Sequence, residues 1–236
     1  KYKPNIMIML LMWYNSINKK MQKGNGKMTK IYNWKEKIDE KELKEVVQIL
    51  KNNGVIIFPT ETVYGIGGNA LSNEVIDKVY NAKNRPRAKA VNIMVSNKSE
   101  IKKYTEITSN LEQKIIDEFL PGPLTIILKK KPDFGTYFTA GNDTIGVRIP
   151  NHRIVNSILN EIDFPIIAPS ANISGEPSGV EATDIIKDFD GKVDAIIDGG
   201  KANQGLSSTI VKVIDNEITI LREGKITKED ILKKIK

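Results

Sequence analysis

The sequence predicts an α/β fold, a single domain in which helices flank a twisted, mixed sheet. Apolar residues at helical spacing alternate along the chain with short, fully apolar runs that are typical of buried strands. Two pairs of such runs, within residues 124–149 and 209–221, follow each other with no helix between them, which favours antiparallel pairs. The chain has 236 residues, and this length fits one domain better than two.

Residues 39–236 carry these elements in a regular order. The first helical pattern, residues 43–50, is followed by Gly54, which we expect to be its C-terminal cap. The next apolar run, residues 55–58, is a predicted buried strand that Pro59 ends. The further predicted elements are a helix that Ser72 caps, a strand at 91–95, a helix at 111–119, strands at 124–128 and 144–149, a helix at 153–159, a strand at 165–168, a helix at 182–189, strands at 195–198, 209–214 and 218–221, and a short helix from Lys228.

The composition favours anionic partners and excludes several kinds of catalytic site. The formal net charge is +7 and the isoelectric point is near 9.3, so nucleotides, phosphates or RNA are suitable ligands. There is no cysteine, which excludes disulfides, thiolate nucleophiles and cysteine-based metal sites. The single histidine, His152, excludes a metal site built from several histidines.

Residues 1–28 are predicted to form a disordered or artefactual N-terminal extension, so that the domain spans residues 29–236. The apolar run at residues 6–14 is too short for a bilayer, which needs about 20 residues, and no membrane span is expected. A basic start before a short apolar run resembles a signal peptide, but no small-residue cleavage site follows. A membrane-associated role or a packing role is the alternative for this segment.

Polar side chains gather where predicted strands end, and residues 59–65 are the first such segment. Thr60, Thr62 and Tyr64 follow a buried strand and lead into glycines that allow close backbone approach. This arrangement suits a small polar ligand, although a plain turn with capping threonines would have the same composition.

A second segment concentrates four cations, Lys83, Arg85, Arg87 and Lys89, directly after a predicted helix. Pro86 disfavours helix at the residue before it, so these side chains are expected on an extended loop. Arginine forks and lysine point charges suit the oxygens of a triphosphate, with a solvated basic loop as the alternative. Neither a Walker A sequence nor a dinucleotide-binding glycine motif occurs in the chain.

Arg148 lies inside an alternating apolar strand, and the sequence leaves its orientation open. An inward guanidinium would need a carboxylate or phosphate partner to offset its desolvation, whereas an outward one would be an ordinary surface residue.

The last polar segments follow the predicted strands of the second half of the chain. The loop at residues 168–179 offers hydroxyls and backbone N–H groups to a phosphate or ribose, from Ala168, Ser170, Asn172, Ser174 and Ser178. Ser208 and Arg222 flank the final pair of strands, where Arg222 suits an anion or is a plain surface residue. The segments together indicate electrostatic stabilisation of phosphate chemistry rather than covalent catalysis.

Seven ordered motifs lie at residues 58–65, 83–86, 121–125, 147–150, 170–175, 208–211 and 222–224. In this order they resemble the YrdC-like threonylcarbamoyl-AMP synthases, in their short, single-domain form. The resemblance runs from about residue 40 to 230. It implies the YrdC-like fold with a positively charged concave face.

The resemblance also implies a reaction and a set of site residues. The family is a group of cytoplasmic nucleotidyltransferases that join L-threonine, bicarbonate or CO2, and ATP into threonylcarbamoyl-AMP and pyrophosphate. Magnesium is expected with ATP, and no tightly bound organic cofactor is expected. A separate transferase complex then modifies tRNA, and RNA or tRNA contact through the basic face is a further expectation. By position, the threonine-binding residues are Thr62, Arg148, Ala168 and Ser208; the ATP-binding residues are Arg85, Lys89, Thr144, Ser170, Ser178 and Arg222; the catalytic residues are Lys83 and Arg85; and Thr60, Tyr64, Asn172 and Ser174 complete the pocket.

Two departures from the family pattern place the chain nearer its short bacterial members. Longer members often have Pro-Leu and then a histidine after the basic motif, where this chain has Ala90, Val91 and Met94. They also carry a further C-terminal domain, whereas this sequence ends soon after Arg222.

Two other functions are weighed against this one. A carbamoyl-adenylate-forming module of the hydrogenase-maturation type shares the fold, but it normally accompanies zinc-finger parts, and this chain has no cysteine to form them. A non-catalytic RNA-binding or ribosome-maturation protein that uses the basic face is the alternative function.

Overall fold

The computed structural model describes residues 28–235, so the predicted N-terminal extension, apart from Met28, lies outside the described residues. Their sheet has the strand order β1-β9-β2-β3-β8-β4-β7-β6-β10-β11, and β5 pairs with β6 at one side. Its strands are β1 (Lys30–Asn33), β2 (Ile56–Phe58), β3 (Gly65–Asn69), β4 (Ile93–Met94), β5 (Thr105–Glu106), β6 (Leu124–Lys130), β7 (Thr144–Arg148), β8 (Ile166–Ile167), β9 (Ala195–Asp198), β10 (Thr209–Ile214) and β11 (Glu217–Arg222). The helices are α2 (Glu40–Lys51), α3 (Asn73–Ala82), α4 (Lys98–Tyr104), α5 (Asn110–Phe119), α6 (Arg153–Asn160), α7 (Ala182–Phe189) and α8 (Lys228–Lys234).

The sheet is mixed, as the sequence predicts. Strands β6 and β7 pair antiparallel, as do β10 and β11, and these are the two pairs that the consecutive apolar runs indicate. Strands β10 and β6 pair in parallel, which joins the two antiparallel pairs into one surface. Within residues 28–235 every helix is too short or too polar to cross a membrane.

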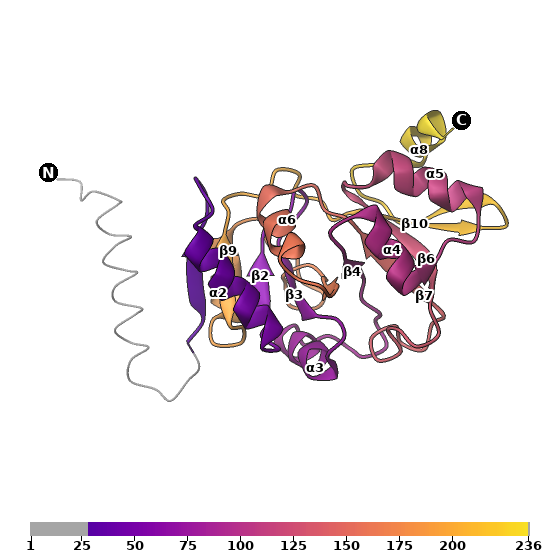
Figure 1. The fold of residues 1–236 in the computed structure, drawn as a ribbon. Helices are drawn as coiled ribbons and strands as arrows, with labels where there is room; N and C mark the ends of the chain where they lie inside the picture. The colour runs from indigo at the N-terminus through magenta and orange to yellow at the C-terminus, as the bar shows by residue number, and fades with distance from the viewer. Residues whose placement is uncertain (1–27, 236) are drawn as a thin grey trace, which may run out of the picture.

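Helices cover both faces of the half of the sheet that contains β2. Ile56 and Phe58 pack in a core under α2 and α6, and these helices lie in front of β9 and β2 in Figure 1. Ile57, which points to the opposite face, belongs to a larger core that α3, α5 and α7 help to build. The two-residue period of a strand therefore places successive side chains of β2 in two different cores.

The half of the sheet that contains β6 is covered on one face only. Leu124, Ile126 and Leu128 of β6 pack in the larger core, together with the apolar side of α5. Thr125 and Ile127, on the opposite face of the same strand, line a cavity. The alternation along β6 thus separates a core face from a ligand-accessible face.

The structure differs from the sequence predictions in one helix cap and in four additional elements. Gly54 is not the cap of α2: the C-cap is Asn52, and Asn53 takes the left-handed conformation (φ 58°) that asparagine tolerates. Gly54 instead allows a close approach, because a Cβ there would lie 2.4 Å from Ile49 Cγ2. Elements β1, β3, α4 and β5 were also not predicted. The glycine-rich segment of β3 lacks a strand pattern, and α4 has a single buried residue, Ile101.

Candidate active site

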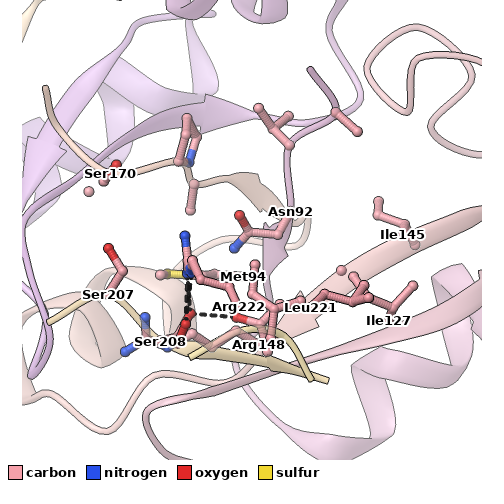
Figure 2. Close-up of a pocket in the computed structure, with 18 of the residues that line it drawn as sticks. Asn92, Met94, Ile127, Ile145, Arg148, Ser170, Ser207, Ser208, Leu221 and Arg222 are labelled. Atoms are coloured by element: carbon pink, nitrogen blue, oxygen red, sulfur yellow. Dashed lines mark hydrogen bonds between the residues drawn. The ribbon is translucent and has the colours of Figure 1, made fainter. Parts of the chain in front are cut away.

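The open face of β6, β7 and β10 forms the floor of a cavity of about 390 Å³. Its walls come from segments far apart in the sequence, and Figure 2 shows Ser170, Ser207 and Ser208 together with Arg148 and Arg222 around it. Gly146 of β7 allows Asn92 and Thr125 to pack closely at the floor of the cavity, because a Cβ at this position would lie 3.0 Å from a side-chain atom of each. Ten of the predicted site residues line this cavity: Thr60, Thr62, Tyr64, Arg85, Thr144, Arg148, Ala168, Ser170, Ser208 and Arg222.

Arg148 points inward, which resolves the orientation that the sequence leaves open. Its side chain is 4% exposed, and its Nη2 atom lies 2.8 Å from Oε1 of the buried Glu61 in an ion pair. Its Nε donates to the carbonyl of Gly122 at 3.2 Å, and its Nη1 donates to Thr62 Oγ1 at 3.0 Å. The carboxylate partner that an inward arginine requires is therefore Glu61.

Thr62 is held so that its hydroxyl has a defined donor direction. Thr60 Oγ1 donates to the carbonyl of Val63 at 2.6 Å, so the 2.8 Å contact between the two threonine hydroxyls is a bond that Thr62 donates. Thr62 Oγ1 also accepts from Arg148. One lone pair of Thr62 Oγ1 then remains for a ligand donor in the cavity.

Ser208 and Arg222 lie together where β10 begins and β11 ends, beside Arg148 (Figure 2). Arg222 donates from Nε and Nη2 to the Ser208 carbonyl at 3.1 and 2.8 Å, and from Nη2 to Ser208 Oγ at 3.0 Å (Figure 2). Ser208 Oγ also lies 2.8 Å from Thr125 Oγ1. Burial, and then the charges of Arg148 and Arg85, lower the pKa of Arg222, so three guanidinium groups share one electrostatic environment.

The four cations of the basic segment separate into different environments. Arg85 lines the cavity and donates to the carbonyls of Lys89 and Ala90. Lys83 is 1% exposed and does not line the cavity: its Nζ donates to the carbonyls of Ser170 and Asn172, each at 2.5 Å. Burial, and then Arg85, lower the pKa of Lys83 to about 7. Lys89 and Arg87 do not line the cavity either, and Arg87 pairs with Asp77 on the surface.

The loop after β8 contributes Ala168 and Ser170 to the cavity, and Asn172 supports the loop from behind. Asn172 accepts from Ser170 Oγ at 2.6 Å and donates to the carbonyls of Ile173 and Glu176. Ser174 and Ser178 are outside the cavity lining, and Ser174 N–H donates to the carbonyl of Lys83.

Tyr64 connects the cavity to the loop that follows β9. Its hydroxyl donates to the carbonyl of Gly200 in that loop at 2.6 Å. Burial, and then Asp198, raise the pKa of Tyr64.

Sequence analysis missed several residues of this site. Glu61, Thr125, Asn92 and Lys212 either line the cavity or hold a lining residue, and the sequence analysis assigned a role to none of them. Thr125 lies within a recognised motif and on the polar face of an alternating strand, a signal that could have identified it. Among residues 28–235, no aspartate or glutamate lines the cavity and no cluster of acidic or histidine side chains could hold a metal ion.

Comparisons with known proteins identify the family of this chain. The family model of the Sua5, YciO and YrdC proteins, described as "Telomere recombination", matches residues 48–224. The chain belongs to this family.

Individual relatives of this Sua5/YciO/YrdC chain carry a common name. The threonylcarbamoyl-AMP synthase of Bacillus subtilis is 37% identical over 194 residues, which are 82% of this chain and 56% of the relative. The putative threonylcarbamoyl-AMP synthase of Methanocaldococcus jannaschii is 43% identical over 205 residues, 85% of this chain and 94% of the relative. The crystal structure of Pyrococcus abyssi Sua5 complexed with L-threonine superposes with a TM-score of 0.83 at 35% identity, covering 87% of this chain and 60% of that one. The chain thus spans little more than half the length of two of these proteins and nearly all of the third.

Proposed function

We propose that this chain is an L-threonylcarbamoyladenylate synthase, which forms threonylcarbamoyl-AMP and pyrophosphate from L-threonine, bicarbonate or CO2, and ATP. The observation that carries the proposal is the cavity, where three arginines and several hydroxyls converge and no described carboxylate lines the wall. Its volume of about 390 Å³ lies in the range of small-molecule sites. The names of relatives at 37% and 43% identity support the same activity.

Two groups of residues in the cavity suit the two substrates. Thr62 and Arg148 provide a fixed acceptor and a buried cation, which suit the amine or hydroxyl and the carboxylate of threonine. Arg85, Ser170 and Arg222 offer guanidinium and hydroxyl donors that suit phosphate oxygens. The relative whose title names L-threonine as its ligand shares this fold at 35% identity, which supports placing the amino acid in the same cavity.

The proposed chemistry needs positioning and charge stabilisation more than a nucleophilic side chain. The amine of threonine attacks CO2 and loses a proton, or attacks bicarbonate with loss of water, and either route gives a carbamate. A carbamate oxygen then attacks the α-phosphorus of ATP, and the bond to pyrophosphate breaks. Negative charge grows on the phosphate oxygens during this step, and fixed guanidinium groups such as Arg85 and Arg222 lower its free energy.

Magnesium is expected with ATP, but the donors of the cavity do not form a magnesium site of their own. Protein-bound Mg²⁺ usually has one or two carboxylate ligands, and the described lining offers hydroxyls and guanidinium groups instead. We therefore propose that magnesium belongs to the substrate as the Mg·ATP complex, held by phosphate oxygens and water.

The product contains an activated carbonyl and an AMP leaving group, so it suits transfer to an amine. We propose that a separate transferase complex uses it to make threonylcarbamoyladenosine in tRNA, and that the reaction takes place in the cytoplasm. The net charge of +7 is compatible with contact to RNA as well.

The direct experiment measures pyrophosphate release with ATP, L-threonine and bicarbonate, and identifies the adenylate by mass. We expect release to require all three substrates and to fall sharply in an Arg85→Ala variant, which should stay folded. Pyrophosphate release that does not depend on threonine, or no release by folded protein, would exclude the proposed reaction.

A further inference from the structure

Arg87, one of the basic-segment cations outside the cavity lining, lies against the buried Tyr80 ring, the exposed Tyr137 ring and a carboxylate. Its guanidinium carbon lies 4.5 Å from the centroid of the Tyr80 ring and 5.3 Å from that of Tyr137. It also forms an ion pair with Asp77. The hydroxyl of Tyr137 lies 2.9 and 3.1 Å from the two carboxylate oxygens of Asp77 and donates to them.

This cluster joins three segments that are separate in the sequence. Asp77 and Tyr80 belong to α3, Arg87 belongs to the basic segment, and Tyr137 belongs to the loop between β6 and β7. An isolated exposed ion pair contributes little to stability. Arg87 differs because its guanidinium lies over two rings while it pairs with a carboxylate, a combination that lysine does not reproduce.

Hydrogen bonds connect the cluster to the cavity wall. The hydroxyl of Tyr80 donates to the carbonyl of Lys89 at 2.8 Å and lies 3.4 Å from that of Phe138. The same Lys89 carbonyl accepts from Arg85 Nε at 3.0 Å, and the Ala90 carbonyl accepts from Arg85 Nη2 at 2.7 Å. The backbone of residues 89 and 90 therefore sets the position of the Arg85 guanidinium.

The basic segment needs such a constraint because its charges oppose a compact loop. Arg85, Arg87 and Lys89 are like charges within five residues, and their mutual repulsion favours loop conformations in which the side chains move apart into solvent. Of the described ion pairs, the one between Arg87 and Asp77 is the only one that a cation of this segment makes.

We propose that Arg87 is a positioning residue: clamped by Tyr80, Tyr137 and Asp77, it fixes the loop that presents Arg85 to the phosphates of ATP. The inference rests on the proposed function only in naming ATP as the anion. Arg87 itself does not touch the cavity, so its effect on nucleotide binding passes through Arg85.

A double-mutant cycle tests this inference, with the dissociation constant of Mg·ATP measured by calorimetry and KM for ATP and threonine measured from pyrophosphate release. Arg87→Ala should weaken ATP binding by about tenfold, the equivalent of one well-placed cation–π and ion-pair contact. Arg87→Lys should weaken it to nearly the same extent, since charge without a planar fork does not restore the combination of ring and carboxylate contacts. KM for threonine should stay within about twofold of the parent value.

The decisive arm is Arg87→Ala in an Arg85→Ala background, where a residue acting through Arg85 should have no further effect on ATP affinity. Additive losses, or an equal rise in KM for threonine, would overturn the proposal. Lys98→Ala, which removes the exposed ion pair with Asp117 on another face, is the matched control and should leave ATP affinity unchanged. Tyr137→Phe, which keeps the ring and removes its bond to Asp77, provides a milder variant should Arg87→Ala fail to fold. A parent protein that binds ATP without making the adenylate would refute the proposed function and leave the affinity test of Arg87 intact.

Discussion

Glu61 and Arg148 form an ion pair that is almost completely withdrawn from solvent, with 2.8 Å between Oε1 and Nη2. The same Oε1 atom accepts from the backbone N–H of Asn151 at 3.2 Å, so the carboxylate also fixes the segment after β7. The pair connects the segment after β2 to a strand in the middle of the sheet, and it orients the one arginine whose direction the sequence left open.

Removing one member of this pair should strongly destabilise the fold. Glu61→Ala leaves a buried guanidinium without its counter-charge, and we expect the free energy of unfolding to fall by about 3–5 kcal/mol. Urea denaturation of the variant and the parent measures this difference. Lys98→Ala, which breaks an exposed pair, should cost less than about 1 kcal/mol. Equal, small losses for both variants would mean that the buried pair is not a stabilising contact.

Arg85→Ala should reduce activity without unfolding the protein. Loss of one positioned donor to a developing oxyanion costs about 3 kcal/mol, or roughly a hundredfold in rate. Because Arg85 lies on a loop, stability should change by no more than about 0.5 kcal/mol. Pyrophosphate release and thermal melting, measured together, check both statements. Lys89→Ala is the informative companion: its side chain does not line the cavity, so a similar loss would show that it reaches the phosphates in the complex.

The buried Lys83 should make stability depend on pH. Its pKa falls from 10.5 to about 7 in the folded chain. The unfolded chain therefore binds more protons between these two values, and the free energy of unfolding should rise with pH across this window, by at most about 1.4 kcal/mol per unit. Below pH 7 both states are protonated and the contribution is flat. Denaturation from pH 7.5 to 9 should show the slope in the parent and a smaller slope in Lys83→Met; parallel profiles would contradict it.

Threonine should be strongly preferred over valine. The hydroxyls of Thr62 and Ser208 face the cavity within hydrogen-bonded networks, and a site that bonds a substrate hydroxyl can reject the analogue lacking it by roughly 10⁴-fold at most. Pyrophosphate release with each amino acid, at equal ATP and bicarbonate, measures the ratio. Similar rates with both would remove threonine as the substrate.

The helices and apolar strands could be predicted from the sequence because their patterns are local. The helix Ala182–Phe189 and the strands Ala195–Asp198 and Thr209–Ile214 have the predicted bounds. Strand β3 could not be predicted, since three of its five residues are glycine and its pairing with β2 and β8 depends on tertiary contacts. Close approach is the reason for one of these glycines, because a Cβ on Gly67 would lie 1.9 Å from the Ile167 carbonyl oxygen.

The site was predictable in its residue types but not in its partnerships. The resemblance assigned Arg85, Arg148 and Ser208 to the site, and all three line the cavity, whereas the residue pattern alone left the orientation of Arg148 open. The sequence could not pair Glu61 with Arg148, which are far apart in the chain and meet only in the assembled sheet. It also could not distinguish Lys83, buried beneath a loop, from Arg85, two residues later and in the cavity, since both lie in one basic motif.

The cavity draws its walls from Thr60 near the beginning of the domain and from Arg222 near its end. During synthesis, almost the whole domain must therefore emerge from the ribosome before the cavity is complete. A nascent chain that stops before β11 lacks the strand that carries Arg222, so any earlier intermediate presents an incomplete cavity. Ligand should bind only the completed domain and protect it as a unit, for example against proteolysis, by mass action on the folded state.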